Sequence, residues 1–163
     1  DHLLQSNIVG TYHVFEAARQ QGVGRVIFFS TNHVSGGYEK AHQTAFAEMP
    51  IRPDSLYAAS KAYGEALGRL YSDRYGLSVI CLRLGSVLPD DVEGIRRMPN
   101  NRHRWLSHRD LAHLIRLCVE APPRVRFLIT YGVSNQPHSP WDIANARQVL
   151  GYSPQDNGEA LAD

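Results

Sequence analysis

Cysteine and long apolar runs are both scarce in this sequence. The two cysteines among 163 residues, Cys81 and Cys118, each lie inside an apolar segment, which indicates buried thiols in a reducing compartment rather than a disulfide or a zinc site. No apolar run approaches the roughly 18 residues that span a bilayer, and no signal peptide is visible. The net charge is only +1, so no overall field attracts nucleic acid or membranes. We therefore expect a cytoplasmic domain with no nucleic-acid or membrane partner.

Lysine is also scarce, because 15 of the 17 basic residues are arginines. One of the two lysines, Lys61, follows Tyr57 by four residues in a helical-looking segment, which places both on one helix face about 6 Å apart. A phenol at pH 7 lies roughly 4 kcal/mol from ionisation, and an ammonium about 4 Å away is worth roughly 4 kcal/mol at an effective dielectric of about 20. Tyr57 and Lys61 could thus form a general base; the alternative is an ordinary surface contact.

Helical and strand patterns alternate along the chain, which favours an α/β domain with a parallel sheet. The first helix contains Ile8, Tyr12 and Phe15 and is expected to end near Gly22. Apolar runs predict buried strands at 25–32, 77–88 and 125–135. Further helices are expected at 55–75, 107–122 and 141–151, and the segments 34–53 and 89–104 are expected to be loops.

Five segments, in this order, resemble the extended short-chain dehydrogenase/reductases, and among them the uronate dehydrogenases most closely. They are "FFSTNH" (28–33), "RPDSLYAASKAYGEAL" (52–67), "LRLGSV" (82–87), "WLSHRDL" (105–111) and "GYSPQDNGEAL" (151–161). The resemblance implies a Rossmann-type doubly wound parallel sheet. Residues 1–163 would be its C-terminal portion, comprising the catalytic half and a small substrate-binding part, with the first strands missing.

The same resemblance implies an oxidoreductase that transfers hydride from C1 of galacturonate or glucuronate to NAD and forms an aldarolactone. Tyr57 would accept the proton of the C1 hydroxyl, and Lys61 would bind the nicotinamide ribose. Thr31 stands where the family usually has serine, and either hydroxyl can hydrogen-bond the reacting oxygen. Asn32 and His33 would contact sugar hydroxyls.

Two further roles follow from matched positions after the second expected strand. Ser86 would lie beside the nicotinamide. Arg97, followed by Met98, matches the family arginine that would bind the uronate carboxylate, for which a planar guanidinium is suited. The same loop also offers Arg96, Arg102 and Arg104, and a solvated basic loop is the alternative to any of them.

Other interpretations remain open. The sequence lacks the glycine-rich turn and the acidic residue of a complete dinucleotide site, so we expect the chain to begin after that part of the family fold. A sugar-nucleotide epimerase or dehydratase is one alternative, and a non-catalytic remnant is another.

His103, His108 and His113 would point about 140° apart on a helix, so no metal site is expected. The full-length form is expected to be a homo-oligomer.

Overall fold

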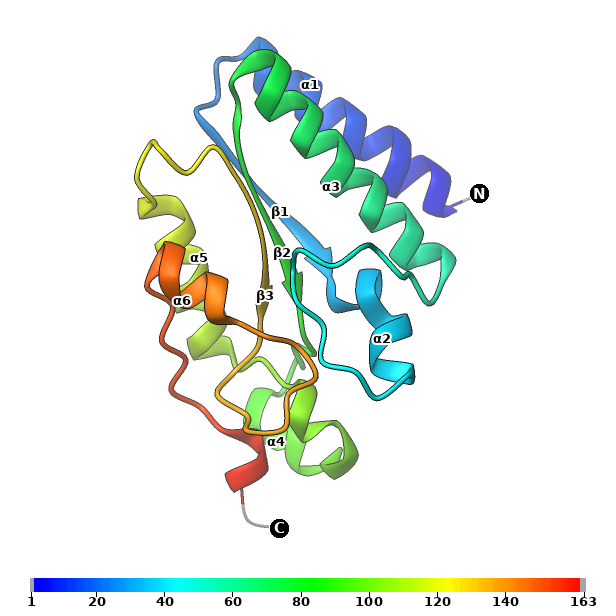
Figure 1. Ribbon diagram of the computed structural model, residues 1–163, viewed down its shortest axis with the longest axis vertical. Helices are drawn as coiled ribbons and strands as arrows, with labels where there is room; N and C mark the ends of the chain where they lie inside the picture. The colour runs from blue at the N-terminus through cyan, green and yellow to red at the C-terminus, as the bar shows by residue number, and fades with distance from the viewer. Residues whose placement is uncertain (1, 162–163) are drawn as a thin grey trace.

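The computed structural model describes residues 2–161 and shows a parallel sheet between two layers of helices (Figure 1). The strands are β1 (Arg25–Thr31), β2 (Ser78–Leu84) and β3 (Phe127–Gly132), in the spatial order β1-β2-β3. The longer helices are α1 (Gly10–Gln20), α3 (Leu56–Tyr75), α5 (His108–Glu120) and α6 (Ala144–Leu150), with a π-helical turn, η1 (Leu4–Val9), before α1. The prediction of an α/β fold with a parallel sheet is confirmed.

The central strand β2 separates two halves of the apolar core. Ile80 and Leu82 pack with side chains of α5 and α6, whereas Val79 and Cys81 pack with side chains of α1 and α3. This follows from the period of a strand, in which successive side chains point to opposite faces of the sheet. Helices cover both faces of β2, and a strand buried in this way is expected to be apolar at successive positions. Arg83 is the one charged residue within it.

Helix α3 is fixed at both ends and along its length. Ser55 caps its N-terminus by accepting a hydrogen bond from the backbone N–H of Ala58 at 3.2 Å, and Gly76 ends it in the left-handed conformation with φ of 74°. Gly64 faces β1, where a Cβ atom would overlap the ring of Phe28. The absence of a side chain at Gly64 therefore allows α3 to lie directly on β1.

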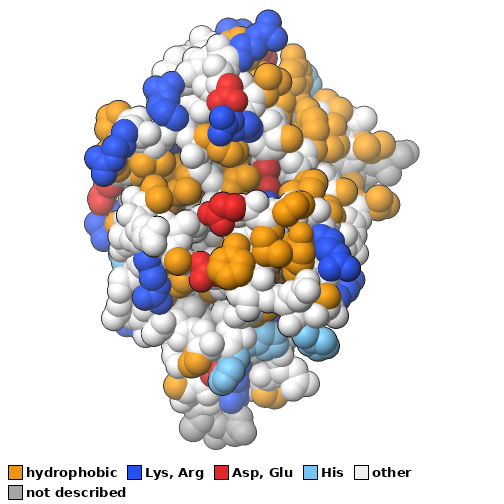
Figure 2. Space-filling view, in the orientation of Figure 1, with side chains coloured by type: hydrophobic (Ala, Val, Ile, Leu, Met, Phe, Trp, Pro, Cys, Tyr) orange, Lys and Arg blue, Asp and Glu red, His pale blue; other side chains and the backbone are white. Residues whose placement is uncertain are grey.

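Strand β1 is an edge of the sheet within residues 2–161, because it pairs there with β2 alone. Phe29 on this strand is 43% exposed, and a groove of about 570 Å³ runs beside β1 between Val14 of α1 and Lys61 of α3. Figure 2 shows hydrophobic side chains gathered over α1 and α3. Phe29 and the groove therefore leave apolar surface beside β1, and one edge of this strand pairs with no other strand within residues 2–161.

Both segments expected to be loops contain short helices, so those two predictions are wrong in part. The helices are η2 (Asn32–Ser35), α2 (Gly36–Lys40), α4 (Asp91–Arg96) and η3 (Pro99–Arg104); a last one, η4 (Gly158–Ala160), lies near the C-terminus. One or two helical turns are too short to show an apolar period in a sequence. Strand β2 also ends earlier than expected, at Leu84, because Ser86 pairs with Trp105 instead of extending the main ladder.

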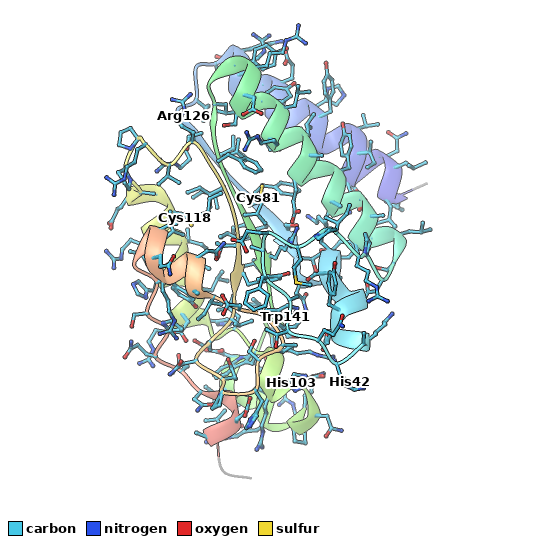
Figure 3. All side chains as sticks on the ribbon, viewed as in Figure 1. His42, Cys81, His103, Cys118, Arg126 and Trp141 are labelled. Atoms are coloured by element: carbon cyan, nitrogen blue, oxygen red, sulfur yellow. The ribbon has the colours of Figure 1, made fainter. Side chains whose placement is uncertain are left out.

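The prediction of two buried, unpaired thiols is confirmed (Figure 3). Burial raises the pKa of Cys81 strongly and raises the pKa of Cys118 to about 12, which keeps both thiols protonated and unreactive. Among residues 2–161, no helix is both long and apolar enough to cross a bilayer.

Candidate active site

Tyr57 and Lys61 lie on one face of α3, as their spacing predicted. The Lys61 ammonium is 5.8 Å from the centroid of the Tyr57 ring, and its Nζ donates a hydrogen bond to the carbonyl of Phe29 at 2.9 Å. Tyr57 is 41% exposed, so an external ligand can reach this residue. The structure therefore places an exposed tyrosine beside an ammonium that is anchored near the carboxyl end of β1.

The Lys61 side chain lies partly out of water. Its burial lowers the pKa of the ammonium below the usual value, because removal of water disfavours the charged form. An ammonium has three N–H donors, and the described residues show one of them taken, by Phe29. The remaining donors match the paired hydroxyls of a ribose, which is the group that the family resemblance implies for Lys61.

Thr31 ends β1 and is held in the turn that follows. Its hydroxyl donates to Asn32 Oδ1 at 3.2 Å and accepts from the backbone N–H of His33 at 3.3 Å. Thr31 and Asn32 are 5% and 6% exposed. Polar side chains at the carboxyl end of a parallel strand are typical of ligand sites in α/β folds, so both remain candidates for contacts with a substrate.

His33 is oriented by Asp54, a residue to which the sequence analysis assigned no role. Asp54 precedes Ser55, the N-terminal cap of α3, and its Oδ2 lies 2.8 Å from His33 Nδ1. Partial burial would raise the pKa of Asp54, but the hydrogen bond and charge of His33 outweigh it and hold that pKa below its usual range. An ionised carboxylate can only accept, so Nδ1 carries a proton and Nε2 is the nitrogen left for a ligand.

Ser86 lies just past β2 and is fixed through its backbone. Its N–H donates to the carbonyl of Arg104 at 2.8 Å, and its carbonyl accepts from Leu106 at 2.9 Å. The Trp105 segment is thereby attached beside the carboxyl end of β2. The Ser86 side chain is half-buried at this junction, close in the fold to the ends of β1 and β2, where a nicotinamide would be expected.

The structure does not bring Arg97 into contact with Tyr57 or Thr31. Arg97 caps the C-terminal end of α4, is exposed, and forms an ion pair with Asp90. The other arginines of this region also have partners: Arg96 with Glu93 at 2.8 Å, Arg104 with Glu39 of α2, and Arg102 with the carbonyl of Leu161 at 2.9 Å. The assignment of Arg97 to the carboxylate therefore stays a prediction.

The residues present fit one end of a dinucleotide. Lys61 offers N–H donors to a ribose, and the hydroxyl of Thr31 and the exposed ring of Tyr57 lie near the strand ends. The 163 residues contain no Gly-x-Gly-x-x-Gly pattern, which would bind a pyrophosphate at a helix N-terminus. The donors and hydroxyls at the strand ends thus fit the nicotinamide end of a dinucleotide, and the 163 residues hold no sequence pattern for the pyrophosphate end.

Comparison with known proteins gives consistent matches. The model of the NAD dependent epimerase/dehydratase family matches residues 1–105. Uronate dehydrogenase of Pseudomonas syringae pv. tomato is 42% identical over 99% of this chain and 56% of its own length. NAD-dependent glucose-6-phosphate dehydrogenase of Haloferax volcanii is 39% identical over 96% of this chain and 63% of its own.

A solved structure adds the fold to these sequence matches. A tyrosine variant of uronate dehydrogenase from Agrobacterium tumefaciens, complexed with NAD, superposes with a TM-score of 0.81 at 34% identity, over 96% of this chain and 56% of that one. The chain therefore spans little more than half the length of the proteins that it matches.

Proposed function

The chain belongs to the NAD dependent epimerase/dehydratase family, and from that premise we propose that it carries out NAD-dependent oxidation of a hexuronic acid, galacturonate or glucuronate, at C1 to an aldarolactone. The observation that carries the proposal is the placement of the Tyr57–Lys61 pair on α3 against the end of β1, where Thr31 and Asn32 follow. The similarity to uronate dehydrogenases over nearly the whole chain supports the choice of substrate.

The proposed chemistry divides into a proton and a hydride. NAD, when bound, supplies the acceptor for the hydride from C1. The Tyr57 phenolate takes the proton from the C1 hydroxyl, and the C1–O bond becomes the lactone carbonyl. The Lys61 ammonium stabilises the negative charge on Tyr57, as expected for opposite charges in a partly buried site.

Thr31, Asn32 and His33 orient the sugar in this proposal. The Thr31 hydroxyl has both a donor and acceptor sites, so it can bind the reacting oxygen before and after proton transfer. In this proposal, ring hydroxyls bind to the Asn32 amide and to His33 Nε2, the nitrogen that the Asp54 contact leaves for a ligand. Ser86 lies beside the nicotinamide, and Arg97 is proposed to bind the carboxylate of the sugar acid.

The test uses the complete gene product that contains this chain, with NADH formation followed by absorbance. We expect turnover with galacturonate or glucuronate and NAD, and Tyr57→Phe should lower turnover at least about a hundredfold because the base is removed while the ring stays. Tyr63→Phe is the matched control, since Tyr63 lies on the same helix but packs with the apolar core. Near-normal turnover of Tyr57→Phe contradicts the role of Tyr57.

The substrate panel separates the alternatives. The similarity to a glucose-6-phosphate dehydrogenase favours glucose 6-phosphate as a second candidate, since a phosphate could occupy the place of the carboxylate. Turnover of glucose 6-phosphate and of neither uronate would assign the site to sugar phosphates. Conversion of a nucleotide sugar without net NADH formation would instead support an epimerase.

We also propose that copies of the chain associate and that the protein acts in the cytoplasm. Leu4 and Leu56, which are 59% and 81% exposed, line an apolar groove between η1 and the start of α3, and such patches are unusual on monomers. Size-exclusion chromatography with light scattering tests the association, and Leu56→Glu should shift the protein toward the monomer.

The proposal that the protein acts in the cytoplasm is supported by its buried, unpaired cysteines, which fit a reducing compartment.

A further inference from the structure

A chain of buried polar contacts begins at Ser30 on β1 and crosses to α3. The Ser30 hydroxyl donates to Glu65 Oε1 at 2.6 Å. Arg83 of β2 binds the same carboxylate with two groups: Nε donates to Oε1 at 2.9 Å, and Nη2 donates to Oε2 at 2.8 Å. The side chains of Arg83 and Glu65 are 2% and 4% exposed, so this ion pair lies in the interior of the protein.

The contacts continue across β3 and return to the turn after β1. Arg83 Nη1 donates to the Tyr131 hydroxyl at 3.2 Å, and that hydroxyl donates to Ser35 Oγ at 2.7 Å. Ser35 Oγ in turn donates to the carbonyl of Asn32 at 2.9 Å. We call this set the Glu65 network: Ser30, Asn32, Ser35, Glu65, Arg83 and Tyr131.

The two ends of the Glu65 network lie on either side of Thr31. Ser30 precedes Thr31 and is bound to the carboxylate, and Asn32 follows it and is bound through its carbonyl. One turn before Glu65 on α3, Lys61 binds the carbonyl of Phe29. The segment that carries the Thr31 hydroxyl is therefore tied, from both directions, to the helix that carries Tyr57.

We propose that the Glu65 network is a positioning device that holds the Thr31 hydroxyl in register with Tyr57. The inference rests on the proposed function, in which both hydroxyls meet the same substrate oxygen. Hydrogen bonds are directional, and a buried polar group that loses its partner raises the free energy of the folded state. The network should therefore favour one arrangement of the segment. A shift of about 1 Å between reacting groups can cost roughly a hundredfold in rate.

The test removes one hydroxyl from the network without removing a charge. Tyr131→Phe breaks the link between Arg83 and Ser35, and Ser35→Ala breaks the same path one bond later. Tyr152→Phe is the matched control, because the Tyr152 hydroxyl is also buried and donates to one acceptor, the carbonyl of Val133 at 2.9 Å. If the removal of a buried hydroxyl lowers thermal stability in general, this control should show the same loss of stability.

In the complete gene product, we expect Tyr131→Phe to lower kcat roughly tenfold while KM changes less than about twofold, since the misplaced group acts on the reacting oxygen. Ser35→Ala should give a similar loss. The double variant should lose little more than either single one, because both changes interrupt one path. Tyr152→Phe should keep the kcat of the parent protein while it loses as much thermal stability as Tyr131→Phe.

Hydrogen exchange measured by mass spectrometry provides a readout that does not depend on activity or on cofactor. The peptide spanning 29–36 should exchange faster in Tyr131→Phe and Ser35→Ala than in the parent protein, and at the parent rate in Tyr152→Phe. If the parent protein oxidises no uronate, the proposed function fails, and faster exchange of this peptide still supports the network as the device that holds the segment.

Two results overturn the inference. The first is a kcat of Tyr131→Phe equal to that of Tyr152→Phe in an active enzyme, which leaves the proposed function intact. The second is unchanged exchange of the 29–36 peptide in both Tyr131→Phe and Ser35→Ala.

Discussion

Replacement of Glu65 by alanine should destabilise the fold by about 3–5 kcal/mol, which is the range for removing one partner of a buried ion pair. The Glu65 carboxylate accepts three hydrogen bonds, from Ser30 and from two groups of Arg83. In Glu65→Ala the guanidinium keeps its charge at 2% exposure and loses the anion that compensates it. The cost is therefore mainly that of an unpaired buried cation.

This loss is large enough to measure in a protein of this size. A domain of 150–250 residues loses about 2–4 °C in Tm per kcal/mol, so a loss of about 3–5 kcal/mol means that Glu65→Ala should melt roughly 6–20 °C below the parent. Urea unfolding followed by circular dichroism should show the same loss as a lower midpoint at constant slope. The control is Asp73→Ala, which breaks an ion pair with Arg69 whose side chains are 59% and 57% exposed and should cost less than about 1 kcal/mol.

The second half of the test removes both charges. Glu65→Leu combined with Arg83→Met should recover at least roughly 2 kcal/mol relative to Glu65→Ala, because apolar residues of similar volume replace buried ion pairs at little cost. The reasoning is refuted if Glu65→Ala costs no more than Asp73→Ala, since the Arg83 guanidinium would then find water or another acceptor in the folded state.

Three further predictions follow from separate parts of the chain. Arg97→Lys should raise KM for uronates several-fold with little change in kcat, because a point charge replaces a bidentate donor. If Arg97→Lys leaves the kinetics unchanged and Arg102→Lys raises KM strongly, the carboxylate binds to Arg102 and not to Arg97. The pKa of Glu16 is lowered to about 2 by hydrogen bonds from Arg19, Gln20 and Tyr71. Its stabilisation should therefore be complete above about pH 4.5 and be lost as the pH falls toward 2, and Glu16→Gln should flatten the curve of Tm against pH in that window. A polypeptide of residues 1–163 alone should give no micromolar NAD signal in calorimetry, because it has no glycine-rich turn and exposes one edge of β1; a clear micromolar signal would show that the cofactor site is more complete than the sequence indicates.

Features that depend on neighbours in the sequence could be predicted. The four-residue spacing of Tyr57 and Lys61 fixes their shared face on α3. Ser55 and Gly76 are typical helix-end residues, and both occupy those positions. The three strands were predicted because each is a short apolar run between polar segments. These signals are local, and tertiary packing did not override them.

Features that join distant residues could not be predicted. Asp54 and His33 are 21 positions apart and meet only because η2 and the start of α3 come together. Ser30 and Glu65 are 35 positions apart. The sequence did carry one signal for the second case: a lone arginine, Arg83, inside a buried apolar strand needs an anionic partner. The identity of that partner depends on how α3 lies on the sheet.

Three polar side chains of helix α3, at steps of about one turn, pass from solvent into the interior. Tyr57 is 41% exposed, Lys61 is half-buried, and Glu65 is 3% exposed, and each step of four residues advances about 6 Å along the axis. The phenol is therefore accessible to substrate, the ammonium is partly desolvated and acts more strongly on its neighbour, and the carboxylate is held by Arg83 where water does not compete. Because all three lie along one helix, the proposed function would make the buried ion pair at Glu65 the anchor that sets the depth of Lys61 and the position of the Tyr57 hydroxyl.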